Sequence, residues 1–328
     1  MFGLSLVDTK IPFMNYQKYW MWFSAILTAV CLAGIVTKGF NFGIDFTGGL
    51  TVEVAYEQPV ELEPLRQQLS VSGFEQAVVQ HFGSTREVLI RTASQEDVSA
   101  QALTEKLLAV LSVDANPHVI KRTEFVGPQV GDELASDGLI ALIAAFLIIT
   151  VYVSVRYEIR FSLGAILGVV HDVIIVAGIF AWMGWLVDLS VLAAILAIIG
   201  YSINDTIVVF DRVRENFRTL RGYSPKEVMD AAINQTLSRT VMTSFTTLLV
   251  VVVLFFTGGE ALHLFALVLI IGIAFGTYSS VYVASSLTLA LGITQDDLMR
   301  KDKGKDKSAV EEDLIADFLQ KEASRGAK

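Results

Sequence analysis

Five polar or ionisable side chains interrupt otherwise apolar stretches of this sequence. His171 and Asp172 are adjacent, Asn204 and Asp205 are adjacent, and Arg239 stands at the start of a third apolar stretch. A charged group inside a bilayer costs at least ~2.5 kcal/mol on insertion scales, so each charge needs a partner, water or a function to account for it. The chemistry open to such groups is the uptake and release of a proton or a cation.

Asp205 and Arg239 are expected at similar, shallow depths. Asp205 precedes Asp211, at the presumed interface, by about 9 Å of helix. A contact between Asp205 and Arg239 is therefore geometrically feasible. Burial and a nearby guanidinium shift the pKa of a carboxylate in opposite directions, so a movement that makes or breaks the pair would bind or release a proton. The alternatives are a static buried pair and an Arg239 that only extends to the headgroups.

Asp172 lies deeper, near the middle of its apolar stretch. Together with His171 it predicts either a second proton relay or a hydrogen-bonded structural pair, and the sequence does not choose between them. Asp172 and Asp205 could also form the dyad of an intramembrane protease. Their estimated depths differ by several residues, which disfavours a shared site.

Small and hydroxyl residues repeat on faces of the same stretches. Such residues let helices approach closely and give a polar lining. Packing is the commoner explanation for glycine and alanine. The threonines, which begin beside Arg239, suggest a hydrated path, although threonine also bonds back to its own helix. The repeated residues are Gly164, Gly168, Ala193, Ala197, Gly200, Gly272 and Gly276, with Thr236, Thr240, Thr243 and Thr247.

Six apolar stretches are long enough to position these groups inside a membrane, since a helical span needs about 20 mostly apolar residues. The composition agrees, because only 18% of the 328 residues are charged, whereas a soluble domain carries about 25%. The sequence therefore predicts a polytopic α-helical membrane protein with six transmembrane helices. The stretches are residues 20–37, 138–155, 162–182, 188–209, 240–257 and 262–291.

Basic residues indicate the orientation, because they resist translocation. Lys and Arg flank one end of each stretch and are missing around 182–188 and 257–263. Both termini are then cytoplasmic. A cleaved signal peptide is the alternative for the first stretch, but no clear cleavage site follows it. The predicted parts are a cytoplasmic N-terminus (1–19), the first helix (20–37), a periplasmic domain (38–137), five further helices (138–292) with a cytoplasmic loop (211–238), and a charged cytoplasmic tail (293–328) with a short helix at 310–321.

The periplasmic insert carries nearly all of the acidity. Residues 38–137 contain 15 acidic and 7 basic side chains, a net charge of −8 out of −9 for the whole chain. Alternation and helical spacing predict the order strand, helix, strand, strand, helix, strand, which is typical of a ferredoxin-like sandwich. His81 and His118 lack metal-ligand spacing and are expected to be ordinary strand residues. The expected elements are strands at 50–56, 76–82, 87–92 and 118–125 and helices at 61–69 and 97–111.

Several functions are disfavoured by the motifs that the sequence lacks. It contains no phosphate-binding GxxxxGK[ST] loop, no HExxH and no GxSxG, so neither ATP hydrolysis nor the corresponding enzyme chemistry is expected. Its one cysteine, Cys31, excludes an internal disulfide and a cysteine-based metal cluster. The sequence contains no long run of Lys and Arg flanked by aromatic residues, so nucleic-acid binding is not predicted. We expect no enzyme activity and no cofactor other than a coupling ion.

Four motifs resemble those of the SecF family of protein-export membrane subunits, which is related to the resistance-nodulation-division transporters. They are GIDFTGG at 43–49, which supplies Gly43, Asp45, Gly48 and Gly49 as a structural motif, GVVHDV at 168–173, GYSINDTIVVFDRVREN at 200–216 and SRTVMTS at 238–244. The resemblance extends from the first predicted span to the sixth.

The resemblance implies half of a twelve-span unit completed by SecD and associated with SecYEG, sometimes with YajC and YidC. In that family the proton or sodium gradient is thought to assist late, outer-side stages of preprotein translocation in the bacterial inner membrane. Asp205, beside Asn204, would be the coupling carboxylate, acting with Arg239 and a carboxylate of SecD. Thr243 and, more weakly, Asp172 are further candidates. A non-coupling assembly subunit and half of a small-molecule exporter remain alternatives, and the sequence does not decide between H⁺ and Na⁺.

Overall fold

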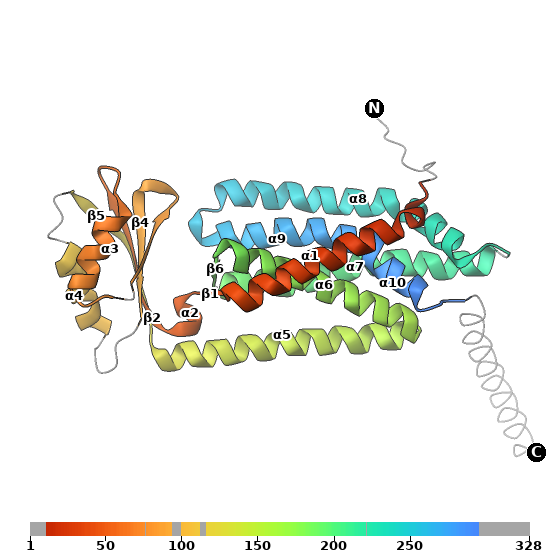
Figure 1. The fold of residues 1–328 in the computed structure, drawn as a ribbon, viewed down its shortest axis with the longest axis horizontal. Helices are drawn as coiled ribbons and strands as arrows, with labels where there is room; N and C mark the ends of the chain where they lie inside the picture. The colour runs from red at the N-terminus through yellow and green to blue at the C-terminus, as the bar shows by residue number, and fades with distance from the viewer. Residues whose placement is uncertain (1–10, 76, 94–99, 112–115, 221, 295–328) are drawn as a thin grey trace, which may run out of the picture.

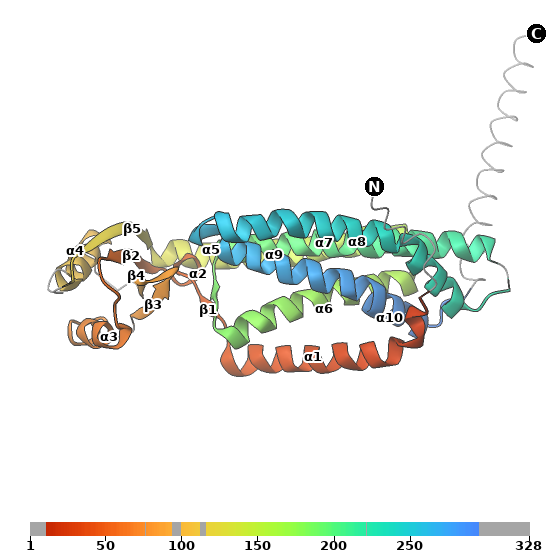
Figure 2. The same ribbon diagram turned by 90° about the horizontal axis from the view of Figure 1, so that it is seen from above.

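The computed structural model describes residues 11–75, 77–93, 100–111, 116–220 and 222–294. A bundle of long helices forms one end of the molecule and a small sheet with two helices forms the other (Figure 1; Figure 2). The predicted tail helix at 310–321 lies outside the described residues.

Six helices in the described residues are long and apolar enough to cross a membrane, which supports the predicted polytopic helical fold. The sixth crossing consists of α9, a π-helical segment and α10 in succession. The helices are α1 (Gln17–Lys38), α5 (Pro128–Arg156), α6 (Ile159–Met183), α7 (Leu189–Thr219), α8 (Pro225–Thr257), α9 (Glu260–Ser279), the π-helix η3 (Ser280–Ala284) and α10 (Ser285–Ala290), with the 3-10 turn η2 (Phe13–Asn15) ahead of α1.

Two of the predicted connections contain helix, because the helices extend beyond their apolar stretches. The expected loop at 211–238 is mostly helix, since α7 continues to Thr219 and α8 begins at Pro225. Likewise, α5 begins at Pro128, inside the range assigned to the periplasmic domain. Hydropathy falls at the first charged residue, whereas helical hydrogen bonding continues until a cap or breaker is reached. At the start of α8, Ser224 and Glu227 form a capping box.

The sheet has the predicted order of elements. It is antiparallel throughout, with strand order β3-β4-β2-β5, and both of its helices lie on the face away from the bundle (Figure 1). Apolar residues alternate along β2, where Leu50, Val52 and Val54 are buried against Leu69 and Leu107 of the helices. The elements are β2 (Gly49–Tyr56), α3 (Leu62–Val71), β3 (Val78–Phe82), β4 (Ser84–Thr92), α4 (Ala100–Leu111) and β5 (His118–Val126).

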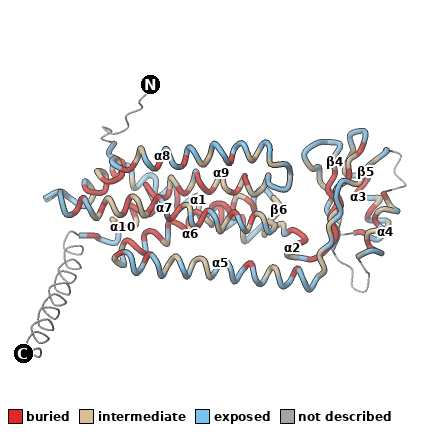
Figure 3. The backbone as a smooth tube through the Cα atoms, turned by 180° about the vertical axis from the view of Figure 1, so that it is seen from behind, coloured by how far each residue is buried: buried red, intermediate tan, exposed pale blue. Residues whose placement is uncertain are grey.

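Helices α6, α7 and the sixth crossing form the core of the bundle. In the apolar 18-residue segment of α6, 56% of the residues are buried, compared with 6% in the corresponding segment of α5 and 17% in those of α1 and α8. The tube in Figure 3 shows α5 as pale blue and tan over nearly all of its length, that is, exposed or half-buried. The polar residues singled out from the sequence on α6 and α7 are therefore placed in the best-packed part of the bundle.

A short two-stranded parallel sheet closes the end of the bundle next to the larger sheet. Strand β1 (Asn41–Phe42) follows α1 and pairs with β6 (Leu186–Val187) between α6 and α7. Neither strand was predicted, because two residues carry no detectable periodicity. The helix α2 (Ile44–Thr47) then leads into β2.

Candidate functional site

Asp205 is buried between three helices and is held by a hydroxyl. Its side chain is on α7 and belongs to a residue only 2% exposed. Ser244 Oγ of α8 donates a hydrogen bond to Asp205 Oδ2 over 3.4 Å. Ser244 Oγ also lies 2.7 Å from Thr277 Oγ1 of α9, which in turn is 2.9 Å from the Ile273 carbonyl oxygen. A line of oxygens thus joins the carboxylate to the backbone of α9.

The protons of this line can be arranged in two ways, because each hydroxyl has a single hydrogen to donate. If Asp205 is ionised, Thr277 donates to Ser244 and Ser244 donates to Asp205. If Asp205 is protonated, the carboxyl donates to Ser244, Ser244 donates to Thr277, and Thr277 donates to Ile273. Both arrangements satisfy every hydroxyl, so the site accommodates either protonation state of the carboxyl group.

Arg239 does not form the predicted contact with Asp205. Among the described residues no hydrogen bond or ion pair joins them, and Arg239 is exposed on α8. The reason is rotational: Arg239 precedes Ser244 by five residues, or about 140° around the helix. When Ser244 faces Asp205, Arg239 necessarily faces another direction.

An exposed polar surface therefore accompanies the buried site. Arg239 and Thr243 are one turn apart and both exposed, and Asn204 of α7 is exposed as well. Among the described residues, none of the three forms a hydrogen bond or ion pair with the carboxylate that the sequence expected them to serve. An arginine exposed on a membrane helix requires a partner or water.

The threonine repeat on α8 divides into two kinds. Thr236, Thr243 and Thr247 donate to backbone carbonyls of α8, at 2.9–3.0 Å. For these residues the predicted alternative applies, namely a hydrogen bond back to their own helix. Thr240 differs, since its hydroxyl is buried and has no hydrogen-bond partner in the described part of the chain. It lies one turn from Ser244, on the face that carries the Asp205 network.

Asp172 is the hub of a second, separate network. The residue is 0% exposed, and its Oδ2 accepts hydrogen bonds from Ser202 of α7 over 2.5 Å and from Ser279 of α9 over 2.7 Å. Its Oδ1 lies 3.0 Å from His171 Nδ1. The predicted His171–Asp172 pair is thus present, and it links α6 to two neighbouring helices. It shares no hydrogen bond with the Asp205 network within the described residues.

Two further features lie beside the Asp172 network: the second ring nitrogen of His171 and the π-helical segment η3. His171 Nε2 is buried and lacks a hydrogen-bond partner among the residues that the structure describes. Ser279, which binds Asp172, is the last residue of α9 before the π-helical turns of η3. Such π-helical segments occur frequently at functional sites.

The glycine pairs serve helix packing. A Cβ on Gly272 would come within 2.0 Å of Ile198, and one on Gly276 within 3.2 Å of Ser202. A Cβ on Gly164 would meet Thr288 at 2.2 Å. Because Gly276 lets α9 approach α7 at Ser202, the glycines bring together the helices that share Asp172.

The glycine motif lies at the junction between the bundle and the sheet. Gly48 and Gly49 have φ values of +66° and +140°, which L side chains rarely adopt. A Cβ on Gly49 would lie 2.4 Å from the Thr92 carbonyl oxygen, and one on Gly131 of α5 would lie 2.6 Å from Gly48 N. Gly43, at φ −73°, instead donates its N–H to Val187 of β6 over 2.8 Å. The motif therefore sets close backbone contacts on both sides.

Charged groups fix the same junction to the start of α7. Asp45 Oδ2 accepts from the Leu189 amide over 3.0 Å, and Asp188 caps α7 by accepting from the Val191 amide over 2.9 Å. From the sheet, Arg91 donates to the Phe42 carbonyl oxygen and to Asn41. Burial lowers the pKa of the Arg91 guanidinium, and the Asp188 carboxylate opposes this shift.

The sequence missed the residues that complete these sites. Arg91, Asp188 and Ser279 belong to no recognised motif. Ser202 and Ser244 lie inside the motifs at 200–216 and 238–244 but were not singled out, because serine is common in apolar helices. Among the described residues, no group of three or more His, Cys, Asp or Glu side chains could hold a metal ion.

Two family models match the chain. Residues 106–294 match the family described as protein export membrane protein SecD/SecF, C-terminal, and residues 33–60 match the SecD/SecF GG motif. The GG motif match covers the junction glycines, and the longer match covers both carboxylate networks.

Characterised relatives match over nearly their full lengths. The chain is 46% identical over 300 residues to the protein translocase subunit SecF of Vibrio alginolyticus, covering 91% of this chain and 95% of the relative. It is 46% identical over 290 residues to that of Pseudomonas aeruginosa, covering 88% and 94%. With that of Escherichia coli O157:H7 it shares 40% identity over 291 residues, covering 88% and 90%.

Solved structures of SecDF show the same fold over part of their length. The translocon-associated membrane protein SecDF of Thermus thermophilus matches with a TM-score of 0.80 at 40% identity, covering 87% of this chain and 39% of that one. SecDF in a super-membrane-facing form matches with a TM-score of 0.64 at 38% identity, covering 93% and 40%. The chain spans about two fifths of each SecDF chain. The glycine motif at the junction and the carboxylates buried in the apolar helices fall inside these matches. The chain is therefore a multi-pass membrane protein of the SecF family of protein translocase subunits.

Proposed function

We propose that this chain pairs with a SecD subunit and couples the proton or sodium gradient to late, outer-side steps of preprotein translocation through SecYEG. YajC and YidC are further proposed partners. The termini lie in the cytoplasm of a bacterium and the sheet lies in the periplasm. Asp205 is the residue that binds and releases the coupling ion.

The observation that carries this proposal is the hydroxyl line from Asp205 through Ser244 to Thr277. It offers satisfied hydrogen bonding to both protonation states of a buried carboxyl group, as a site that titrates in every cycle requires. A carboxylate with nearby hydroxyls also suits Na⁺, because both are oxygen ligands. Asp172 serves as a second candidate site within the same bundle.

The exposed surface of Arg239, Thr243 and Asn204 supports pairing with a second membrane subunit. An exposed guanidinium at membrane depth is stabilised by an opposing carboxylate. We assign that carboxylate to SecD, and movement of the two halves then brings Arg239 alternately near to and far from it. The SecDF matches support this pairing, since this chain accounts for only 39–40% of those chains.

The half-exporter alternative requires an apolar pocket in the sheet domain. One pocket beside the sheet includes Arg91, Arg122 and Glu124, and another, at α3, includes Glu61, Gln68 and Asn116. A large apolar cavity occurs instead among the membrane helices. The alternative therefore gains no support from the sheet domain.

The test is reconstitution of the chain with SecD and the translocon in sealed vesicles. H⁺ and Na⁺ gradients are imposed separately while release of a translocated preprotein is followed. We expect one of the two gradients to accelerate release in the wild type and neither to do so in Asp205→Asn. The matched control is Asp132→Asn, which neutralises an exposed carboxylate on α5.

A non-coupling, structural subunit predicts a different outcome. Asp205→Asn would then assemble with SecD and still respond fully to the imposed gradient. That result would reject the coupling role while leaving family membership intact.

A further inference from the structure

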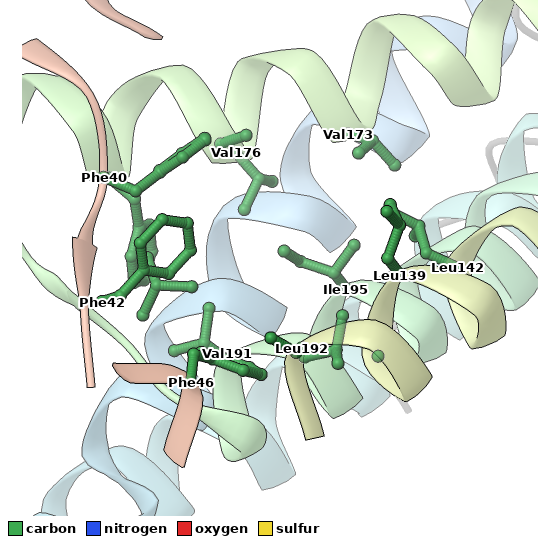
Figure 4. Close-up of a pocket in the computed structure, with 15 residues that line it drawn as sticks. Phe40, Phe42, Phe46, Leu139, Leu142, Val173, Val176, Val191, Leu192 and Ile195 are labelled. Carbon is green, nitrogen blue, oxygen red and sulfur yellow. The ribbon is translucent and has the colours of Figure 1, made fainter. Parts of the chain in front are cut away.

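A cavity of about 460 Å³ lies between α5, α6 and α7. Its α6 wall comes from the last turns of that helix, around Val173 and Phe180, and its α7 wall from the first turns, around Val191 and Ile195. Because α6 ends and α7 begins beside β6, the cavity occupies the half of the bundle next to the sheet. Figure 4 shows lining side chains such as Val173, Leu139 and Ile195 around it. No step of the proposed ion coupling uses it.

The lining of the cavity is apolar throughout. None of its side chains can donate or accept a hydrogen bond, so water would lack the two to four polar partners that keep it in a buried site. An extended peptide would leave its backbone groups unsatisfied there. The lining residues are Phe40, Phe42, Phe46, Ala135, Gly138, Leu139, Leu142, Val173, Val176, Ala177, Phe180, Val187, Val191, Leu192 and Ile195.

The cavity opens along α5 toward the surroundings of the bundle. Two of its lining residues are partly at the surface, Leu139 at 58% and Phe42 at 47% exposure. Contacts of α5 with the rest of the chain include Gly131 against Gly48 and Gly138 against Leu192. From Leu139 onward the exposed residues of α5 are mainly apolar, and in a membrane such a stretch is surrounded by hydrocarbon. The exposed Asp132 and Asp137 place the opening at the headgroup edge of that hydrocarbon.

The volume also restricts the occupant. Protein interiors contain few voids larger than a water molecule, so a space of this size does not persist empty. A helix of the partner subunit is about 10–12 Å across with a pitch of 5.4 Å. About one helical turn would fill the cavity, which therefore cannot accept a helix along its length. A flexible linear hydrocarbon fits such a space.

We propose that this cavity binds an acyl chain of a membrane phospholipid from the leaflet on the sheet's side of the bundle. The chain enters past Leu139 and Phe42 and lies against α6 and α7. Since lipid tails are already in hydrocarbon, binding is favoured by dispersion contacts that an empty cavity lacks, rather than by the hydrophobic effect. The bound chain fills the space between α5 and the packed core.

The test uses the complex with SecD in phospholipid nanodiscs, in which part of the lipid carries a photoreactive diazirine on its acyl chain. After illumination, the modified residues are identified by peptide mass spectrometry. We expect adducts on the half-buried lining residues Val173 and Leu192, which decide the question, whereas Leu139 is also open to ordinary contact with lipid. Ile143 and Leu147, exposed on α5 and outside the lining, report ordinary contact with lipid.

Filled variants provide the comparison. Ala177→Phe on α6 and Ala135→Phe on α5 each place a ring in the cavity, and we expect both to lose the adducts at Val173 and Leu192. The matched control is Ala141→Phe, at an exposed α5 position outside the lining, which should retain them.

Two results would overturn the proposal. The first is labelling of the wild-type complex at Ile143 and Leu147 but not at Val173 and Leu192, as expected if SecD covers the opening. The second is unchanged lining adducts in the filled variants. The wild-type map requires no variant, so it decides the question even if a filled variant assembles poorly.

Discussion

At the scale of single residues, the two buried carboxylates are held by hydroxyls and a histidine rather than by lysine or arginine. Asp205 accepts from Ser244, and Asp172 accepts from Ser202 and Ser279. A hydroxyl can reverse the direction of its hydrogen bond when a carboxyl gains a proton, whereas a guanidinium can only donate. This difference separates a site that can titrate within the bundle from a permanent ion pair.

The first prediction concerns Ser244. Ser244→Ala removes the link between Asp205 and Thr277 and leaves the ionised carboxylate without its donor, while Ser244→Thr keeps a hydroxyl. Because a hydrogen bond to a charged group contributes about 1.5–3 kcal/mol, we expect gradient-driven preprotein release to fall roughly tenfold or more in the alanine variant. The threonine variant should recover most of it. Equal release rates for the two variants would exclude the hydroxyl from the coupling path.

The second prediction concerns Asp172. Asp172→Asn keeps the shape but removes the charge and one acceptor from a residue that three groups contact. Leaving buried hydrogen-bonding groups unsatisfied costs about 1–3 kcal/mol each, so the thermal midpoint of the purified complex should fall clearly below that of the wild type. Asp137→Asn, at an exposed position on α5, is the control. An unchanged midpoint for Asp172→Asn would mean that the network does not hold the helices together.

The sequence predicted the carboxylates of these sites but not their partners. Asp172 and Asp205 stand out because charge is costly in an apolar stretch. A serine in the same stretch costs little, so even Ser202 and Ser244, which lie inside quoted motifs, gain a role only when helices from distant parts of the chain are placed side by side. For Arg239 the sequence suggested a contact with Asp205 that the described residues do not show. The depth of Arg239 matches that of Asp205, but depth does not indicate on which face of α8 a residue lies.

At the scale of secondary-structure elements, the junction around the glycine motif joins the sheet directly to the helices. Strand β2 begins at Gly49 and pairs with β4, whose Arg91 reaches back to the segment between α1 and α2. Asp45 of α2 accepts a hydrogen bond from the amide of Leu189, the first residue of α7, which is the helix that carries Asp205. A displacement of α7 along its axis would therefore act on the base of the sheet.

The third prediction tests the close contact in this junction. Gly131→Ala places a Cβ 2.6 Å from Gly48 N, whereas Gly127→Ala, one helical turn earlier, meets nothing within 4 Å. Overpacking of this kind costs about 1–3 kcal/mol. We expect Gly131→Ala to lower the thermal midpoint of the complex and Gly127→Ala to leave it nearly unchanged.

A protease digest can locate the effect of the Gly131→Ala change. Faster cleavage within residues 38–127 of Gly131→Ala, but not of Gly127→Ala, is expected if the contact anchors the sheet. Equal digestion of the two variants would argue that the sheet is held independently of α5.

Element order was predictable here and element length was not. The alternation of apolar residues in β2 and the spacing in α3 follow the periods of strand and helix, which the sequence displays directly. The C-terminal end of α7 and the N-terminal end of α8 continue into polar sequence, where hydropathy does not indicate a helix. Strands β1 and β6 exist only because α1 and the α6–α7 connection meet at the same end of the bundle, which is a property of the tertiary fold.

At the scale of the whole molecule, the chain has a packed membrane core and two unequal surfaces. The core is formed by α6, α7 and α9, while α8 exposes Arg239 and Thr243 and α5 exposes a nearly continuous apolar surface. Apolar helix surfaces suit lipid, whereas a guanidinium does not. The arrangement therefore favours the α8 surface as the one that meets SecD.

The fourth prediction follows from that surface. Arg239→Met keeps apolar bulk and removes the charge, while Arg239→Lys keeps the charge and loses the planar group of five N–H donors. We expect the methionine variant to impair gradient-driven release more strongly than the lysine variant, with both variants still assembling with SecD. Equal activity of the two variants in the same vesicles would rule out the charge-based role of Arg239.

The central claim is that Asp205 binds and releases the coupling ion, and ion flux tests it most directly. Proteoliposomes containing the complex with SecD are loaded with a pH-sensitive or sodium-sensitive dye, a gradient of H⁺ or Na⁺ is imposed, and its decay is recorded for the wild type, Asp205→Asn and the control Asp132→Asn. We predict that the wild type and the control dissipate one of the two gradients and that Asp205→Asn abolishes this flux while assembly is retained. Flux in Asp205→Asn equal to that of the wild type would contradict the account.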